Sequence, residues 1–155
     1  MQHLVFSDET AATYPVAILT PAIQKPQIAA AYIGSQLPAE DVLVLDLFQA
    51  PGKKKTPMGE MRAYVEEELA PVLNDMGVEH VLVADAEYFK AITKLPKADV
   101  NLGYACDSPF GPWKVFYIPN YQQIFYDPDR VKAKISLVLT ALEDFRKGRY
   151  AAPGN

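Results

Sequence analysis

Val42-Leu-Val-Leu-Asp-Leu-Phe48 is a nearly continuous apolar run of strand length. A strand with one wet face alternates apolar and polar residues, whereas a strand of a parallel sheet is covered on both faces and is apolar throughout. The run therefore predicts a buried strand of a parallel sheet. Three other short apolar segments share this character and are expected in the same sheet: Val16–Thr20, Val81–Asp85 and Val115–Ile118.

Helix signals separate these strands. Thr56-Pro57 and Asp127-Pro128 each place a capping side chain before a proline, which is favoured at the first helical position. Pro71 predicts a kink or an early end of the first of these helices. Further helices are expected within 22–36 and over 86–94, and 95–112 predicts loops, with a short edge strand as an alternative. The apolar stripes of the two capped helices recur at three- and four-residue steps: Met61, Val65, Leu69 and Val72, then Val131, Ile135, Val138, Leu142 and Phe145.

Strands that alternate with amphipathic helices predict an α/β fold. The expected form is a three-layer sandwich around a central, mostly parallel four-stranded sheet with right-handed crossovers. The 155 residues suit one domain, expected over 1–147, with a flexible tail over 148–155. Half of the residues are hydrophobic, which is enough for a sizeable core.

Composition limits the possible partners. A net charge of -4 and a pI near 5.1 argue against a bulk electrostatic grip on nucleic acid, so any contact with DNA requires a local basic patch. The single cysteine, Cys106, excludes an internal disulfide and a cysteine-only metal cluster, and we expect a buried reduced thiol in a cytoplasmic protein. No apolar run approaches the roughly 20 residues of a membrane span.

Ligands of open α/β sheets bind at the carboxyl ends of the strands, and this chain carries little chemistry there. No glycine-rich phosphate loop follows any predicted strand, so no nucleotide cofactor is expected. His3 lies in a terminus expected to be mobile and His80 at a strand start, so neither is placed to act as a base. Asp85 is the one carboxylate at a strand end; it is either an acid or base or, as we favour, the cap of the next helix.

Several segments, in order, resemble the iron–sulfur uracil-DNA glycosylases. Asp46-Leu-Phe-Gln-Ala-Pro-Gly-Lys-Lys-Lys-Thr-Pro57 is similar to that family's Pro-Pro-Gly-Asn-Arg-x-Pro-Thr-Pro stretch, and Val81-Leu-Val-Ala-Asp85 stands where the family has its next strand. Phe116-Tyr-Ile-Pro-Asn120 occupies the place of the family's Thr-Tyr-His-Pro-Ser motif, before an Asp-Pro and a final helix. The resemblance spans roughly residues 16–147 and implies a glycosylase-like fold.

The departures from that family imply a domain without catalytic residues. Leu19-Thr20-Pro21-Ala22 lacks the group that positions water, and Ile118 stands at the position of the histidine that stabilises the departing uracil. Such an electrostatic contribution is worth about 3–4 kcal/mol. The cluster cysteines are absent, so the resemblance implies no metal cluster and no cofactor. It leaves a vestigial pocket of six residues: Thr20, Pro21, Asp85, Ile118, Pro119 and Asn120.

Two segments are also similar to the glycosylase-like amino-terminal region of bacteriophage family A DNA polymerases. They are His80-Val-Leu-Val-Ala-Asp-Ala-Glu-Tyr-Phe89 and Ile118-Pro-Asn-Tyr-Gln-Gln-Ile-Phe-Tyr-Asp-Pro128. This resemblance implies a replication role in the host cytoplasm, with a DNA polymerase or another replisome protein as partner. The alternative is a small phage interaction protein, an inhibitor or decoy that uses the glycosylase fold.

DNA is the second partner that we expect, through basic and aromatic side chains near the vestigial pocket. Lys53, Lys54 and Lys55 form a basic loop, and Tyr121 in a later loop offers a ring on which a base can stack. Both loops leave carboxyl ends of strands, so they are expected on one edge of the sheet. A second basic cluster and further aromatics accompany them: Arg130, Lys132 and Lys134, with Tyr117, Phe125 and Tyr126. The competing interpretation is a solvated lysine loop and aromatics that belong to the core.

Overall fold

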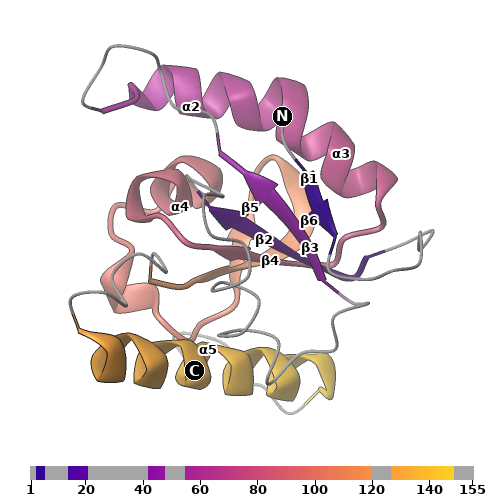
Figure 1. Cartoon of the computed structure of the whole chain (residues 1–155). Coiled ribbons are helices and arrows are strands. Elements are labelled where there is room, and N and C mark those ends of the chain that lie inside the picture. Colours follow the sequence, from indigo (N-terminus) through magenta and orange to yellow (C-terminus); the bar gives the residue numbers. More distant parts are fainter. Residues whose placement is uncertain (1–2, 6–13, 21–41, 48–54, 120–126, 149–155) are drawn as a thin grey trace.

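The computed structural model describes residues 3–5, 14–20, 42–47, 55–119 and 127–148 (Figure 1). Within them a six-stranded sheet has the order β1-β3-β2-β4-β6-β5. The strands are β1 (His3–Val5), β2 (Val16–Thr20), β3 (Val42–Asp46), β4 (His80–Val83), β5 (Cys106–Ser108) and β6 (Gly111–Tyr117). The four neighbouring strands β3, β2, β4 and β6 run parallel, so the predicted α/β class with a mostly parallel sheet is confirmed.

The edges of the sheet correct the prediction of four strands. β1 pairs antiparallel with β3, and β5 pairs antiparallel with β6. His3 lies opposite Leu45 in this ladder, so its assignment to a mobile terminus was wrong. The strand β5 confirms the alternative of a short edge strand within 95–112. Its Cys106 is buried, as expected, and burial raises the pKa of the thiol to about 11. Three-residue strands carry too little alternation to be recognised from sequence.

The helix after β3 changes its winding where Pro71 interrupts it. Helix α2 (Met58–Tyr64) continues into a π-helical segment, η2 (Val65–Leu69), and then into α3 (Ala70–Asp75). The Ala70 N–H donates to the Val65 carbonyl, one residue farther back than in an α-helix. Proline has no N–H and crowds the carbonyl four residues earlier, so the wider turn accommodates it. The predicted interruption is therefore a π-segment.

The capping signals predicted the start of one helix correctly and placed the start of the other one residue too early. Helix α5 (Pro128–Arg146) begins at the proline, and the Asp127 carboxylate accepts from the Arg130 N–H at 3.4 Å. Helix α2 begins at Met58, one residue after Pro57. Helix α4 (Ala86–Thr93) lies close to the predicted 86–94, and its C-cap is Lys94, which has a positive φ of 61°.

Helices cover both faces of the sheet, and each face has its own core. Figure 1 shows α5 on one side of the strands and α2 and α3 on the other. Leu19, Leu45 and Val83 face the side of α2, α3 and α4, whereas Ile18 and Phe116 face α5. No helix in the described ranges is both long and apolar enough to cross a membrane. The helix expected within 22–36 and the tail residues 149–155 lie outside the described residues.

Candidate functional site

The carboxyl ends of the four parallel strands form one continuous edge. The Leu47 N–H donates to the Thr20 carbonyl at 2.8 Å, and the Ala84 N–H donates to the Leu19 carbonyl at 2.8 Å. The Ile118 N–H donates to the Val83 carbonyl at 3.0 Å. These bonds extend the ladders just beyond the strands. The sequence order reverses between β2 and β4, and such a switch point is where α/β sheets bind ligands.

Asp85 at this edge caps a helix. Its Oδ2 accepts from the Tyr88 N–H at 2.9 Å, and its extended backbone makes it the N-cap of α4. Burial raises the pKa of the carboxyl, and the bond from Tyr88 opposes that shift. The capping interpretation favoured from the sequence is confirmed, and the carboxylate oxygen that makes this bond is committed to the helix.

Two substitutions of Asp85 distinguish the effect of its capping hydrogen bond on stability from the effect of its charge. Asp85→Ala is expected to lower the free energy of unfolding by about 1 kcal/mol, because the Tyr88 N–H loses its acceptor. Asp85→Asn keeps an acceptor and removes a buried charge. Because the folded-state pKa of Asp85 is raised, the wild type should lose stability relative to Asp85→Asn as the pH rises through that pKa. Urea unfolding from acidic to neutral pH measures both effects; equal losses in the two variants would contradict the capping role.

Two other residues of the predicted vestigial pocket are buried. Thr20 and Ile118 are each 2% exposed. Ile118 packs in the core between the sheet and α5, together with Phe116, and is not among the residues that line the cavity described next. The Thr20 hydroxyl is buried and has no hydrogen-bond partner among the residues that the structure describes. Pro21 and Asn120, from the same set, lie outside the described residues.

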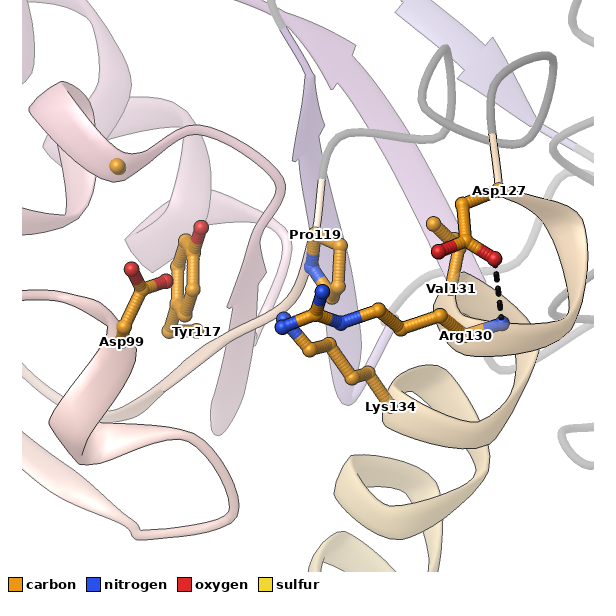
Figure 2. A pocket seen from close by; sticks show the side chains of 8 residues that line it. Asp99, Tyr117, Pro119, Asp127, Arg130, Val131 and Lys134 are labelled. Atoms are coloured by element: carbon orange, nitrogen blue, oxygen red, sulfur yellow. Dashed lines mark hydrogen bonds between the residues drawn. The ribbon is translucent and has the colours of Figure 1, made fainter.

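A cavity of about 520 Å³ opens beside Pro119 at the ends of β4 and β6. Figure 2 shows Asp99 and Tyr117 at one end and the first turns of α5 at the other, with Pro119 between them. The lining residues come from four separate stretches of chain: Ala86, Asp99, Tyr117, Pro119, Asp127, Arg130, Val131 and Lys134. The site thus combines a strand end, two helix starts and the loop before β5.

At the Tyr117 end of the cavity, the phenol of Tyr117 is uncharged and the carboxyl group of Asp99 lies beside it. Tyr117 is 7% exposed and packs against Phe89, with ring centroids 5.6 Å apart. Burial, and next the charge of Asp99, raise the pKa of Tyr117 to about 12. Its hydroxyl therefore stays protonated at neutral pH and is a hydrogen-bond donor. The sequence allows Tyr117 either to stack on a base or to belong to the core. In the structure Tyr117 is largely buried but still borders the cavity.

The α5 end of the cavity is cationic. Arg130 and Lys134 are four residues apart, which places them on one face of the helix. Figure 2 shows both side chains extending from α5 towards Pro119. Arg130 is exposed and Lys134 half-buried, and neither makes an ion pair with a carboxylate in the described part of the chain. Lys132, predicted in the same basic cluster, is exposed and does not line the cavity.

The basic loop before α2 is described only at its last lysine. Lys55 Nζ lies 3.5 Å from Glu87 Oε1, and Lys90 Nζ lies 2.9 Å from the same oxygen. Lys55 thus stands beside the start of α4, next to Asp85. Lys53, Lys54 and Tyr121 of the predicted DNA contact, with Phe125 and Tyr126, lie outside the described residues.

Neither histidine is close to the cavity. His80 begins β4 at the opposite, amino edge, is 7% exposed, and contacts the Phe145 ring with centroids 5.4 Å apart. Burial, and next the charge of Arg146, lower its pKa, so the ring stays neutral. β1, which holds His3, is three strands from β4, about 14 Å at ordinary strand spacing. Among the described residues, no three His, Cys, Asp or Glu side chains are grouped to hold a metal ion.

Asp99 is the site residue that sequence reasoning missed. It lies in a short 3₁₀ turn (Asp99–Asn101) within a stretch rich in loop formers, where nothing local distinguishes it from a solvated aspartate. Folding brings it beside Tyr117, eighteen positions later in the chain. No protein-family model matches this chain, and no curated protein has a significantly similar sequence.

Proposed function

We propose that this chain is a non-catalytic, uracil-DNA glycosylase-like module of a phage replication complex, which associates with a DNA polymerase and contacts DNA with the carboxyl edge of its sheet. The proposal takes its family from the resemblance in the order of motifs. The observation that carries the contact is the cavity at that edge, where Arg130 and Lys134 project without a described anionic partner. A local cationic site of this kind suits an acidic protein that lacks a basic surface overall.

The absence of catalysis is supported by where the described polar groups lie. Asp85 is committed to capping α4, and His80 lies at the opposite edge. Ile118, which stands at the position of the glycosylase histidine, is buried in the core against α5. A glycosylase needs a group that activates water and a donor for the leaving base. Among the described residues, neither Asp85 nor Ile118 supplies such a group at the carboxyl edge.

Association with a polymerase rests on the two segments that resemble the phage enzymes. The first forms β4 and α4, joined by the Asp85 cap, and its Phe89 is fully buried in the core. Its similarity therefore lies in residues that build the fold. The second begins at Ile118, in the core, and ends at Asp127-Pro128, of which Asp127 borders the cavity. A role in replication places the protein in the host cytoplasm.

A protein-binding role, as inhibitor or decoy, is the second candidate. It is favoured by the net charge of -4 and by large apolar side chains that remain exposed: Val100, Tyr104 and Leu137, at 65%, 42% and 53%. Leu137 on α5 lies against Gly103, so this apolar surface joins the loop before β5 to that helix. Surfaces of this kind mark contacts with other proteins.

Incubation with uracil-containing DNA is expected to produce no abasic sites. The test is a gel assay for strand cleavage at abasic sites, with an active glycosylase as the positive control. Ile118→His should not create activity, because the new imidazole would be buried at a position that is 2% exposed. It should also lower the melting temperature, since an unpaired buried polar group costs about 1–3 kcal/mol. Cleavage by the unmodified protein would contradict the non-catalytic assignment.

Binding of DNA is tested by fluorescence anisotropy with a short labelled single strand and a duplex. Saturable binding that weakens as salt increases is expected. If neither DNA binds at low salt, the protein-binding candidate takes precedence, and co-purification with the polymerase encoded by the same phage becomes its test.

A further inference from the structure

We propose that the cavity beside Pro119 binds a phosphomonoester, carried by the end of a nucleic acid strand or by a free nucleotide. In its strand-end form the inference rests on the proposed function, because it names the part of the nucleic acid that this edge recognises. The juxtaposition that carries it is two cationic side chains, Arg130 and Lys134, at one end of a partly open cavity that has Asp99 at its far end.

The α5 end of the cavity carries the cations Arg130 and Lys134, together with the carboxylate of Asp127 that caps the helix. Arg130 and Lys134 are like charges at i and i+4, which repel each other on a helix surface. No described carboxylate forms an ion pair with either of them: Asp127 accepts from the Arg130 backbone N–H as the helix cap, and Asp129, directly before Arg130, is exposed. A phosphomonoester carries close to two charges at neutral pH, whereas an internal phosphodiester carries one. Guanidinium and ammonium groups are the usual partners of such phosphates.

The opposite end selects against a second phosphate. Asp99 borders the cavity there, and the Tyr117 hydroxyl beside it stays protonated. A carboxylate repels another anion, but it accepts from hydroxyl or amine donors. Pro119 lies between the two ends, and Ala86 and Val131 are the other apolar residues of the lining. The lining therefore suits a ligand with its charge at one end and hydrogen-bonding groups at the other, joined by a less polar body such as a sugar.

The volume suits one nucleotide and excludes a duplex. About 520 Å³ falls in the range of roughly 300–1,000 Å³ that is usual for small-molecule sites. An internal nucleotide is flanked by two phosphodiesters, whereas a 5′-phosphorylated strand end carries its terminal phosphomonoester and only one phosphodiester, so it brings less negative charge near Asp99. Preference for a terminal phosphate should therefore appear in addition to any general attraction of the edge for DNA.

The experiment compares four probes with the full chain. Isothermal titration calorimetry measures binding of a 5′-phosphorylated and a 5′-hydroxyl octathymidylate, of thymidine 5′-monophosphate and of thymidine. The phosphorylated strand is expected to bind about tenfold more tightly than its hydroxyl counterpart, and the monophosphate more tightly than thymidine by a similar factor.

Two variants test the assignment, and a third serves as the matched control. Lys134→Gln and Arg130→Gln should each abolish most of the preference for phosphate. Lys132→Gln removes the same charge from the same helix, but Lys132 is exposed and does not line the cavity, so it should preserve the preference. Circular dichroism confirms that each variant is folded, and Arg130→Gln, at an exposed position, replaces Lys134→Gln if the latter unfolds.

The outcomes separate this inference from the proposed function. Equal binding of the two strands would overturn the phosphate site and leave DNA contact intact, as would an equal loss in Lys132→Gln. Binding of the monophosphate without either strand would support the site as one for free nucleotides and reject DNA contact. Failure of all four probes would overturn the phosphate site and contact with single-stranded DNA, which leaves the duplex in the anisotropy experiment to decide DNA contact.

Discussion

Replacing Lys53, Lys54 and Lys55 together by alanine is expected to flatten the salt dependence of DNA binding. Each lysine that meets a phosphate releases a counterion, so the log–log slope should fall by up to about 2 for a single strand and about 3 for a duplex. Lys55 is 70% exposed and only 3.5 Å from Glu87, but an exposed ion pair is worth about 0–1 kcal/mol and does not prevent a phosphate contact. Anisotropy titrations at several salt concentrations measure the slope.

The control for this variant uses lysines at the other edge of the sheet. Lys114 pairs with His80 in the register of β4 and β6, and Lys147 follows the end of α5. Replacing both by alanine should leave the slope unchanged if contact is confined to the carboxyl edge. The triple variant should also keep its melting temperature, because an exposed ion pair such as that of Lys55 with Glu87 contributes little to stability. An unchanged slope in the triple variant would remove the basic loop from the interface.

Gly111→Ala is expected to lower the free energy of unfolding by about 3 kcal/mol, at the upper end of what overpacking usually costs. An added Cβ would lie 2.2 Å from Cζ2 of Trp113 and 2.4 Å from its Cη2. The ring has little freedom to retreat, since Trp113 is 1% exposed and its Nε1 donates to Asn74 Oδ1 at 3.1 Å. Either β6 shifts or the indole leaves its place against α3.

Two measurements check this expectation. Urea unfolding gives the change in free energy, and the fluorescence of Trp113, the single tryptophan of the chain, reports whether the indole moves. Gly59→Ala is the matched control, because a Cβ at Gly59 meets nothing within 4 Å, and alanine is the better helix former. Wild-type stability and emission in Gly111→Ala would mean that the indole packs elsewhere.

Features that depend on neighbours along the chain were predictable. The four parallel strands were found because continuous apolar runs reflect burial on both faces. Asp127-Pro128 and Asp85 were identified as helix starts because a cap is satisfied within three residues. The interruption at Pro71 was predicted for the same reason, although its form, a π-segment that ends before α3, depends on how the helix packs on the sheet.

Which side chains meet in the site was decided only by the tertiary structure. Tyr117 and Ile118 are adjacent in sequence, but they face opposite layers because side chains alternate across a strand, so one borders the cavity and the other packs against α5. Asp99 joins the site through the path of a loop, for which no periodic signal exists.

The sequence by itself determined the fold class, and it determined that His80 begins a strand and so lies at the edge opposite the strand ends. Both conclusions follow from residue types and short-range patterns. The edge strands β1 and β5 needed the tertiary structure, since they are held by hydrogen bonds to β3 and β6 rather than by their own composition. The cationic end of the cavity needed it as well. The sequence predicts one basic cluster of Arg130, Lys132 and Lys134. An α-helix rotates by about 100° per residue, so Lys132 lies on another face than Arg130 and Lys134. The packing of α5 against the sheet directs Arg130 and Lys134 towards Pro119.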